Sequence, residues 1–181
     1  MKRITHTPCF ADFSDDNFIY IDKTKQIYNL LYYFRVFISR PRGFGKSLML
    51  DTIATLFEKG VEPYFRGTWI YNKWKEEKYP VLRLDFLEYN TSDYNAFAED
   101  FGNSIKNFAS DLNLAGYIHD PDPSNCLISL FDELNETETE IVILIDEYDA
   151  PLTANTDNEE LYKKFQEKFK DLNGVILLNL W

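Results

Sequence analysis

The expected fold rests on one stretch of sequence, Ser39-Arg40-Pro41-Arg42-Gly43-Phe44-Gly45-Lys46-Ser47. It follows an apolar run at residues 36–38 and leads directly into residues 48–57, whose apolar side chains recur at helical intervals. A strand, a glycine-containing loop that ends in Gly-Lys-Ser, and a helix form the setting in which backbone N–H groups can hold phosphate oxygens. The stretch therefore predicts a phosphate-binding loop and the binding of a nucleotide.

Each residue type in this loop has a chemical reason to be there. Glycines let the backbone turn tightly and bring N–H groups close to phosphate, where the positive end of the helix adds its field. Lys46 is expected to reach the β and γ phosphates, and the Ser47 hydroxyl is expected to bind Mg²⁺. The predicted nucleotide-binding residues are Arg42, Gly43, Phe44, Gly45, Lys46, Ser47 and Leu48.

The loop departs from the usual spacing at its start. The usual pattern has a glycine, four further residues and then Gly-Lys-Ser or Gly-Lys-Thr, and here Arg40 occupies the position of the first glycine. This departure leaves Arg40 and Arg42 beside the expected phosphate site. A basic turn before a helix is the alternative interpretation of the same residues.

Composition limits the classes of protein to which this chain can belong. A chain of 181 residues, 45% hydrophobic and 17% aromatic, is long enough for one domain with a packed core. No apolar run reaches the ~18–20 residues that cross a bilayer, and no signal-like segment follows residues 1–6, so a cytoplasmic protein is expected. Cys9 and Cys126 are expected to be free thiols, and two histidines make no metal-ligand cluster.

Charge is unevenly distributed along the chain. The net charge is −11. Residues 1–80 hold 13 Lys and Arg against 9 Asp and Glu, a net charge of +4, whereas residues 81–181 hold 6 against 21, a net charge of −15. Nucleic-acid binding depends on neutralising phosphates and is not supported by so acidic a chain. The basic charge gathers instead around the expected phosphate loop.

The first third of the chain is expected to be an arm followed by a helix and a strand. Residues 1–20 are expected to pack as an irregular arm on the core. Asp22 is a plausible N-cap for a helix over residues 23–32, and residues 35–39 are expected to form the strand that enters the loop. Gly60 is expected to end the helix that follows the loop.

The rest of the chain alternates strands with helices. A strand is expected at residues 80–86, a helix at 92–113, a helix capped by Ser124 that runs to residue 134, and a buried strand at 141–145. Such alternation is typical of a parallel sheet with helices on both faces. The predicted fold class is α/β, a three-layer sheet like that of a P-loop NTPase.

A second group of candidate residues follows the buried strand at residues 141–145. Ligands bind outside the carboxyl ends of parallel strands, where Asp146 is expected to hold Mg²⁺ and Glu147 to polarise an attacking water. Adjacent acids at a strand end also occur as ordinary solvated turns, but a Gly-Lys-Ser loop about a hundred residues upstream favours the functional interpretation. Asp85, which ends the preceding strand, could approach the site, although such an acid is more often a cap or a solvated group.

Tyr148 and Asp149 follow these acids directly. Tyr148 and Asp149 could orient the carboxylates, and Asp149 could equally cap the segment that follows Pro151.

Four segments together resemble the AAA-ATPase-like family of bacterial proteins. They are Tyr20-Ile21-Asp22-Lys23-Thr24, the loop of residues 37–47, residues 79–86, and Ile145-Asp146-Glu147-Tyr148-Asp149-Ala150-Pro151-Leu152. The resemblance covers about residues 8–172 and makes the missing glycine a family trait. It implies that Gly45, Lys46 and Ser47 hold phosphate and Mg²⁺, that Asp146 is the Walker-B acid and that Glu147 is the catalytic base. Family members typically join this domain to a C-terminal nuclease-like domain of the PD-(D/E)XK type.

The end of the chain departs from the family. Residues 159–170 supply the expected helix, and residues 173–181 form an apolar tail in which Asn179 could occupy the sensor position of a late strand. That tail comes too soon after the helix for a late strand, and its apolar character suggests either a gene product truncated at its C-terminus or a change of reading frame. It contains no nuclease motif. The expected organisation is therefore an arm at 1–20, an ATPase-like domain at 21–172 and a tail at 173–181.

The sequence thus predicts ATP binding and Mg²⁺-dependent ATP hydrolysis, with Lys46 and Glu147 as catalytic residues. No arginine finger can be assigned from the sequence: Arg40 and Arg42 are candidates within the chain, but such fingers often come from a second copy or a partner. The alternatives are a nucleotide-binding module or fragment without turnover, and a P-loop kinase for a small molecule. The adjacent Asp-Glu pair favours water over a kinase acceptor.

Overall fold

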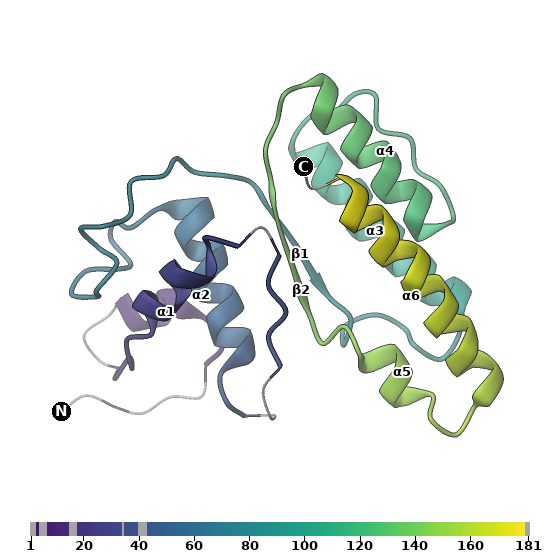
Figure 1. Cartoon of the computed structure of the whole chain (residues 1–181), viewed down its shortest axis with the longest axis horizontal. Coiled ribbons are helices and arrows are strands. Elements are labelled where there is room, and N and C mark those ends of the chain that lie inside the picture. The colour runs from purple at the N-terminus through teal and green to yellow at the C-terminus, as the bar shows by residue number, and fades with distance from the viewer. Residues whose placement is uncertain (1–2, 4–6, 15–17, 34, 40–42, 180–181) are drawn as a thin grey trace. The chain divides into compact units, whose positions relative to one another are not determined.

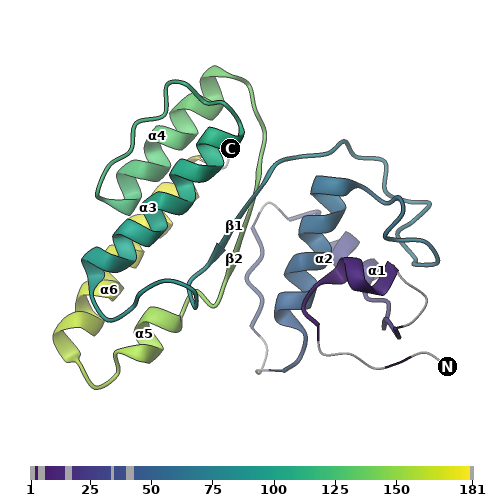
Figure 2. The ribbon, with the colours of Figure 1, turned by 180° about the vertical axis from the view of Figure 1, so that it is seen from behind.

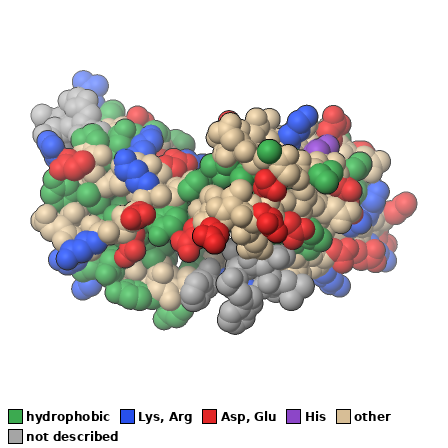
Figure 3. All heavy atoms as spheres, turned by 90° about the horizontal axis from the view of Figure 1, so that it is seen from above, with side chains coloured by type: hydrophobic (Ala, Val, Ile, Leu, Met, Phe, Trp, Pro, Cys, Tyr) green, Lys and Arg blue, Asp and Glu red, His purple; other side chains and the backbone are tan. Residues whose placement is uncertain are grey.

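The computed structural model of the chain describes residues 3, 7–14, 18–33, 35–39 and 43–179. These residues form two compact units, Met1–Val81 and Leu82–Trp181. Both are visible in Figure 1 and, from behind, in Figure 2. Hydrophobic side chains remain on the surface of the protein, as the green spheres of Figure 3 show.

The first unit is built on three helical segments. They are the 3-10 helix η1 (Phe10–Ser14), α1 (Thr24–Leu30) and α2 (Lys46–Lys59). Phe10, Leu56, Phe65 and Ile70 form one cluster of its buried core. α2 is the expected loop helix, and it ends at Gly60 with a φ of 75°, a left-handed conformation that glycine adopts without steric cost. The predicted extent of this helix is confirmed.

Asp22 joins two parts of the first unit. Its Oδ1 accepts hydrogen bonds from the backbone N–H and the hydroxyl of Thr24, at 2.8 and 2.7 Å, and its Oδ2 accepts one from Trp69 N at 2.6 Å. The helix that was expected over residues 23–32 is shorter, and Lys23 occupies its N-cap position without a side-chain capping bond. Asp22, which lies one residue before the N-cap position, therefore fixes the start of α1.

The strand expected at residues 35–39 is absent from the structure. This segment has no regular secondary structure, and the side chains of Val36 and Phe37 are 43% and 68% exposed. A short strand is stable only beside another strand, and apolar composition alone does not supply that neighbour. The prediction of a strand at this position is wrong for the described structure.

The second unit contains the sheet. Its elements are β1 (Val81–Asp85), α3 (Tyr94–Asp111), α4 (Pro123–Glu136), β2 (Val142–Asp146), α5 (Ala150–Ala154) and α6 (Glu159–Asn179). β1 begins at the last residue of the first unit. β1 and β2 pair in parallel as a two-stranded sheet. The α/β class and both of these strands are confirmed.

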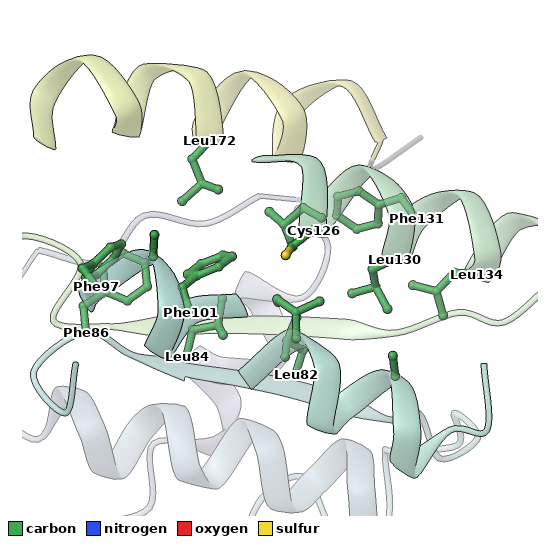
Figure 4. Close-up of a cluster of buried hydrophobic side chains, with 14 of the residues drawn as sticks. Leu82, Leu84, Phe86, Phe97, Phe101, Cys126, Leu130, Phe131, Leu134 and Leu172 are labelled. Carbon is green, nitrogen blue, oxygen red and sulfur yellow. The ribbon is translucent and has the colours of Figure 1, made fainter. Parts of the chain in front are cut away.

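One face of this sheet packs against α3, α4 and α6. Figure 4 shows Leu82, Leu84 and Phe86 on the same side of the sheet as the helices. Phe97 of α3 meets Phe165 of α6 edge to face, with ring centroids 5.3 Å apart, a favourable aromatic geometry. The apolar side chains of β1, α3, α4 and α6 thus form one continuous core.

The N-terminus of α4 differs from the prediction by two residues. Asp122, rather than Ser124, is the N-cap, and its Oδ1 accepts a hydrogen bond from Ser124 N at 2.9 Å. Pro123 occupies the first helical turn, where its missing N–H costs nothing. Asp122 and Ser124 are both acceptable N-cap residues, and Pro123 favours Asp122, which precedes it.

Residues 173–179 are helical, whereas the sequence allowed a late strand at this position. α6 continues to Asn179, so this residue does not lie on a strand. Its apolar residues Leu161, Phe165, Phe169, Leu172 and Ile176 all belong to or pack against the core, and their spacing keeps the helical period. The segment after residue 172 therefore extends the helix.

Candidate functional site

The two glycines of the predicted phosphate loop lie where the backbone requires them. Gly45 is the N-cap of α2 with φ 72° and ψ 34°, and Gly43 has a φ of 81°. A Cβ at either position would meet nothing within 4 Å. Left-handed backbone, rather than lack of space, is what favours glycine at both positions.

The N-terminus of α2 has no side-chain cap. Its N-cap makes no side-chain capping bond, because Gly45 has no side chain. The bond from Met49 N to Gly45 O, at 3.1 Å, closes the first helical turn, and N–H groups before it are left outside the α-helical ladder. Ser47 is exposed and Lys46 half-buried. A 14-residue helix thus directs the positive end of its dipole at exposed backbone.

The remaining predicted loop residues have different positions. Phe44 is 65% exposed and Leu48 is half-buried at the start of α2. Arg42, like Arg40, lies outside the described residues. The described part of the loop is therefore Gly43 to Leu48.

The second group of candidates lies where β2 ends. The Oδ1 of Asp146 accepts a hydrogen bond from the backbone N–H of Glu147 at 2.9 Å, and Ala150 N donates to Glu147 O at 2.8 Å. Glu147 has a φ of 48°, which is unfavourable for a residue with a side chain. Strained backbone of this kind tends to occur at functional sites. Both acids are half-buried.

Asn155 anchors the short helix after these acids. It is 8% exposed, and its Nδ2 donates to Pro151 O in α5 and to Thr91 O in the loop after β1, both at 2.8 Å. The sequence did not indicate this residue, because an asparagine among small polar neighbours is typical of an ordinary loop. Asp149 occupies the N-cap position of α5 but makes no side-chain capping bond.

The predicted residues thus fall into two groups. Gly43 to Leu48 lie in the first unit, and Asp146 and Glu147 lie in the second. Within the described residues, no group of three or more His, Cys, Asp or Glu side chains is placed to hold a metal ion. A hollow of about 300 Å³ lies elsewhere in the second unit, between α4 and the loop of residues 116–120, and no predicted site residue lines it.

Comparisons with known proteins agree with these motifs. The model of a family described as "Predicted AAA-ATPase" matches residues 6–179. An "Uncharacterized protein in vnfD 5'region" of Azotobacter chroococcum mcd 1 is 33% identical over 168 residues, which is 89% of this chain and 31% of that protein. The chain therefore spans about a third of the length of this relative. No solved structure matches. Among the described helices, none combines the length and apolar character needed to cross a membrane.

Proposed function

The chain belongs to the predicted AAA-ATPase family, and we propose that it binds ATP and hydrolyses it with Mg²⁺. The observation that carries the proposal is the loop at Gly43 and Gly45, whose left-handed backbone leads into the uncapped N-terminus of α2. Backbone N–H groups at a helix N-terminus are a ready site for phosphate.

The loop would supply the phosphate contacts. In this proposal Arg42 and the backbone from Gly43 to Leu48 surround the phosphates. Lys46, half-buried at the first position of α2, stabilises negative charge on the transferred phosphoryl group. The exposed chain at Gly43, Phe44 and Gly45 fits a ligand that is contacted mainly by backbone.

The residues proposed for the metal fit Mg²⁺ by their chemistry. Ser47 offers a hydroxyl oxygen and Asp146 a carboxylate, which are the hard oxygen donors that Mg²⁺ prefers. The ion, when bound, neutralises charge on the β and γ phosphates. Glu147 would accept a proton from the attacking water. The small number of acidic ligands suits an ion that keeps several waters and uses phosphate oxygens as ligands.

The larger architecture is also part of the proposal. We place the catalytic core in residues 21–172, with residues 1–20 as an arm and 173–181 as a tail, in a three-layer P-loop sheet of a cytoplasmic ATPase. A second copy or a partner would supply an arginine finger, a contribution that can be ~10³-fold in rate or more.

The first test is ATP binding by the whole chain, measured with radiolabelled ATP at equilibrium. Lys46→Ala is expected to weaken binding at least ~10-fold, because the charge next to the phosphates is lost. Lys59→Ala is the matched control, since Lys59 is exposed at the other end of α2. Unchanged binding in Lys46→Ala would refute the phosphate-loop assignment.

Phosphate release from the same samples separates the proposal from its main rival. A binding module without turnover would hold ATP and release no phosphate above background. The proposed ATPase releases phosphate, and this release requires Mg²⁺.

A further inference from the structure

Asn155 is a buried polar residue whose side-chain amide donates two hydrogen bonds. It is 8% exposed, and its Nδ2 donates to the backbone oxygens of Thr91 and Pro151, both at 2.8 Å. A carboxamide has two N–H groups, and both acceptors here are carbonyl oxygens, so only its nitrogen can face them. These two bonds, which we call the Asn155 link, connect segments that lie 64 residues apart in the sequence.

The loop that contains Thr91 is itself held by side-chain hydrogen bonds. Asn90 N donates to Asp100 Oδ2 in α3 at 2.7 Å, and Ser92 N donates to Asn90 Oδ1 at 3.0 Å. The carbonyl oxygen of Thr91 lies between these two bonded residues. It is therefore an anchored acceptor for the Asn155 amide.

The helix at the other end of the link has little that stabilises it by itself. α5 contains only five residues, and Asp149 at its N-cap makes no side-chain capping bond. Pro151, in its first turn, has no backbone N–H to donate. An isolated helix of this length is not stable in water, so the position of α5 depends on its packing against the core and on the Asn155 link.

The start of α5 is bonded directly to Glu147. Ala150 N donates to Glu147 O at 2.8 Å, and Glu147 has left-handed backbone with a φ of 48°. A residue with a side chain keeps such a conformation only where its surroundings hold it. The Asn155 link reaches Pro151, which follows Ala150 directly. The backbone that bonds Glu147 is thus held in place from Thr91.

We propose that Asn155 is a positioning residue for Glu147, holding α5 so that the Glu147 carboxylate meets the attacking water in the geometry needed for proton transfer. This inference rests on the proposed function and adds to it a residue that acts only through another. A general base needs a distance of about 2.6–3.2 Å to the group whose proton it accepts, and a displacement of about 1 Å can lower a rate ~10²-fold. Loss of the link should therefore slow the chemical step and leave ATP binding unchanged.

The experiment is a double-mutant cycle in the full chain, measured as phosphate release at saturating ATP. Asn155→Ala should release phosphate at least ~10-fold more slowly than the unmodified chain, with the KM for ATP changed less than ~2-fold. In the Glu147→Gln background the same change should lower the rate less than ~2-fold, because the carboxylate that Asn155 positions is already gone. A purely structural Asn155 would lower the rate by the same factor in both backgrounds, and that result would overturn the inference.

Ser129→Ala is the matched control. The Ser129 hydroxyl is a half-buried group of α4 that accepts a hydrogen bond from Ile118 N at 2.7 Å. Its removal also takes a polar partner from the backbone of the second unit, but it touches neither α5 nor the loop of Thr91. Phosphate release should match that of the unmodified chain. A loss as large as that in Asn155→Ala would show a general effect of stability and would overturn the role of Asn155.

Amide hydrogen exchange gives a readout that needs no turnover. The N–H of Ala150 should exchange faster in Asn155→Ala than in the unmodified chain, whereas the N–H of Phe101, in the middle of α3, should not change. Equal protection of Ala150 in the two proteins would contradict the link. If Asn155→Ala does not fold, Asn155→Ser, which keeps one donor, replaces it in both measurements.

The outcomes separate this inference from the proposed function. If the unmodified chain releases phosphate and Asn155→Ala lowers the rate equally in both backgrounds, the inference is wrong and the proposed function stands. If the unmodified chain releases no phosphate, both are wrong.

Discussion

The first and second units of this protein carry their candidate residues in different ways. In the first unit, Gly43, Gly45 and the start of α2 depend on local backbone conformation. In the second unit, Asp146 lies at the end of a strand whose register is set by β1 and by three helices. The proposed phosphate site thus needs only a loop and a helix, whereas the arrangement of the acidic residues needs an assembled sheet.

The hydrophobic cores of the two units also differ. In the first unit, Phe10, Leu56, Phe65 and Ile70 form a buried cluster, and carboxylates also accept backbone hydrogen bonds. The second unit has a continuous core that joins β1, α3, α4 and α6. Damage to the second core should therefore be the most costly change.

Removal of a ring from the second core should have the largest effect. Phe101 is 0% exposed, so Phe101→Ala should lower the free energy of unfolding by about 3–5 kcal/mol through lost burial and a cavity. Guanidinium unfolding followed by far-UV circular dichroism measures the change. Ile118→Ala, at a side chain that is 73% exposed, is the control. A loss below about 1 kcal/mol in Phe101→Ala would contradict the assignment of this core.

Loss of a polar contact in the first unit should cost less. Asp22→Ala removes the acceptor of three hydrogen bonds, from the N–H and hydroxyl of Thr24 and from Trp69 N. We expect a loss of about 2 kcal/mol, since hydrogen bonds to charged groups are stronger than average and two of the three donors are backbone N–H groups. Asp12→Ala is the control, because Asp12 accepts an exposed bond from Thr7. Equal effects of the two changes would show that Asp22 does not hold this unit together.

The backbone at Glu147 predicts an effect of opposite sign. With φ at 48°, Glu147→Gly should raise the free energy of unfolding by about 1 kcal/mol, because glycine adopts this conformation without strain. Glu138 has a φ of 50° and is exposed, so Glu138→Gly should stabilise by a similar amount. Only the change at residue 147 should abolish phosphate release. A destabilised Glu147→Gly would indicate that the side chain supports the fold.

The smallest effect is expected at the ion pair between α4 and α6. Burial alone would raise the pKa of Asp122, but Lys168 Nζ at 2.7 Å and the N–H of Ser124 outweigh it and hold that pKa below its usual value. The pair therefore stabilises the protein above about pH 4, and this contribution disappears as the pH falls through the lowered pKa. Lys168→Met should cost about 0.5 kcal/mol at pH 7.

The pH dependence of urea unfolding tests this sign. The difference between Lys168→Met and the unmodified chain should shrink as the solution becomes more acidic. Lys163→Met breaks a more exposed pair with Glu159 and should change stability less at pH 7. A difference for Lys168→Met that grows towards acid pH would contradict the assigned pKa direction.

Elements with a strong local pattern could be predicted from sequence. The helical spacing of α2, with Gly60 after it, and the apolar run of β2, with Asp146 at its end, are properties of short segments. The α/β class followed from the alternation of such segments. The Gly-Lys-Ser motif likewise predicts where α2 begins, and no tertiary information is needed for that prediction.

Features that depend on distant residues could not be predicted. The segment at residues 35–39 has the composition of a strand, but a strand also needs a neighbour. The hydrogen bond from Phe86 N to Asp146 O depends on the register between strands that are separated by two helices in the sequence. Asn155 donates a hydrogen bond to the backbone of Thr91, which is 64 residues away in the sequence. The left-handed backbone at Glu147 cannot be predicted from the residue type, because glutamate rarely adopts it.

The most direct test of the account is phosphate release per bound ATP in Glu147→Gln, measured beside Glu138→Gln. Both changes remove one carboxylate from a residue with left-handed backbone. The account predicts that Glu147→Gln binds ATP as tightly as the unmodified chain and releases phosphate at least ~10²-fold more slowly, the usual scale of a lost general base. Glu138→Gln should match the unmodified chain in both respects. Unimpaired phosphate release from Glu147→Gln would contradict the role given to this residue.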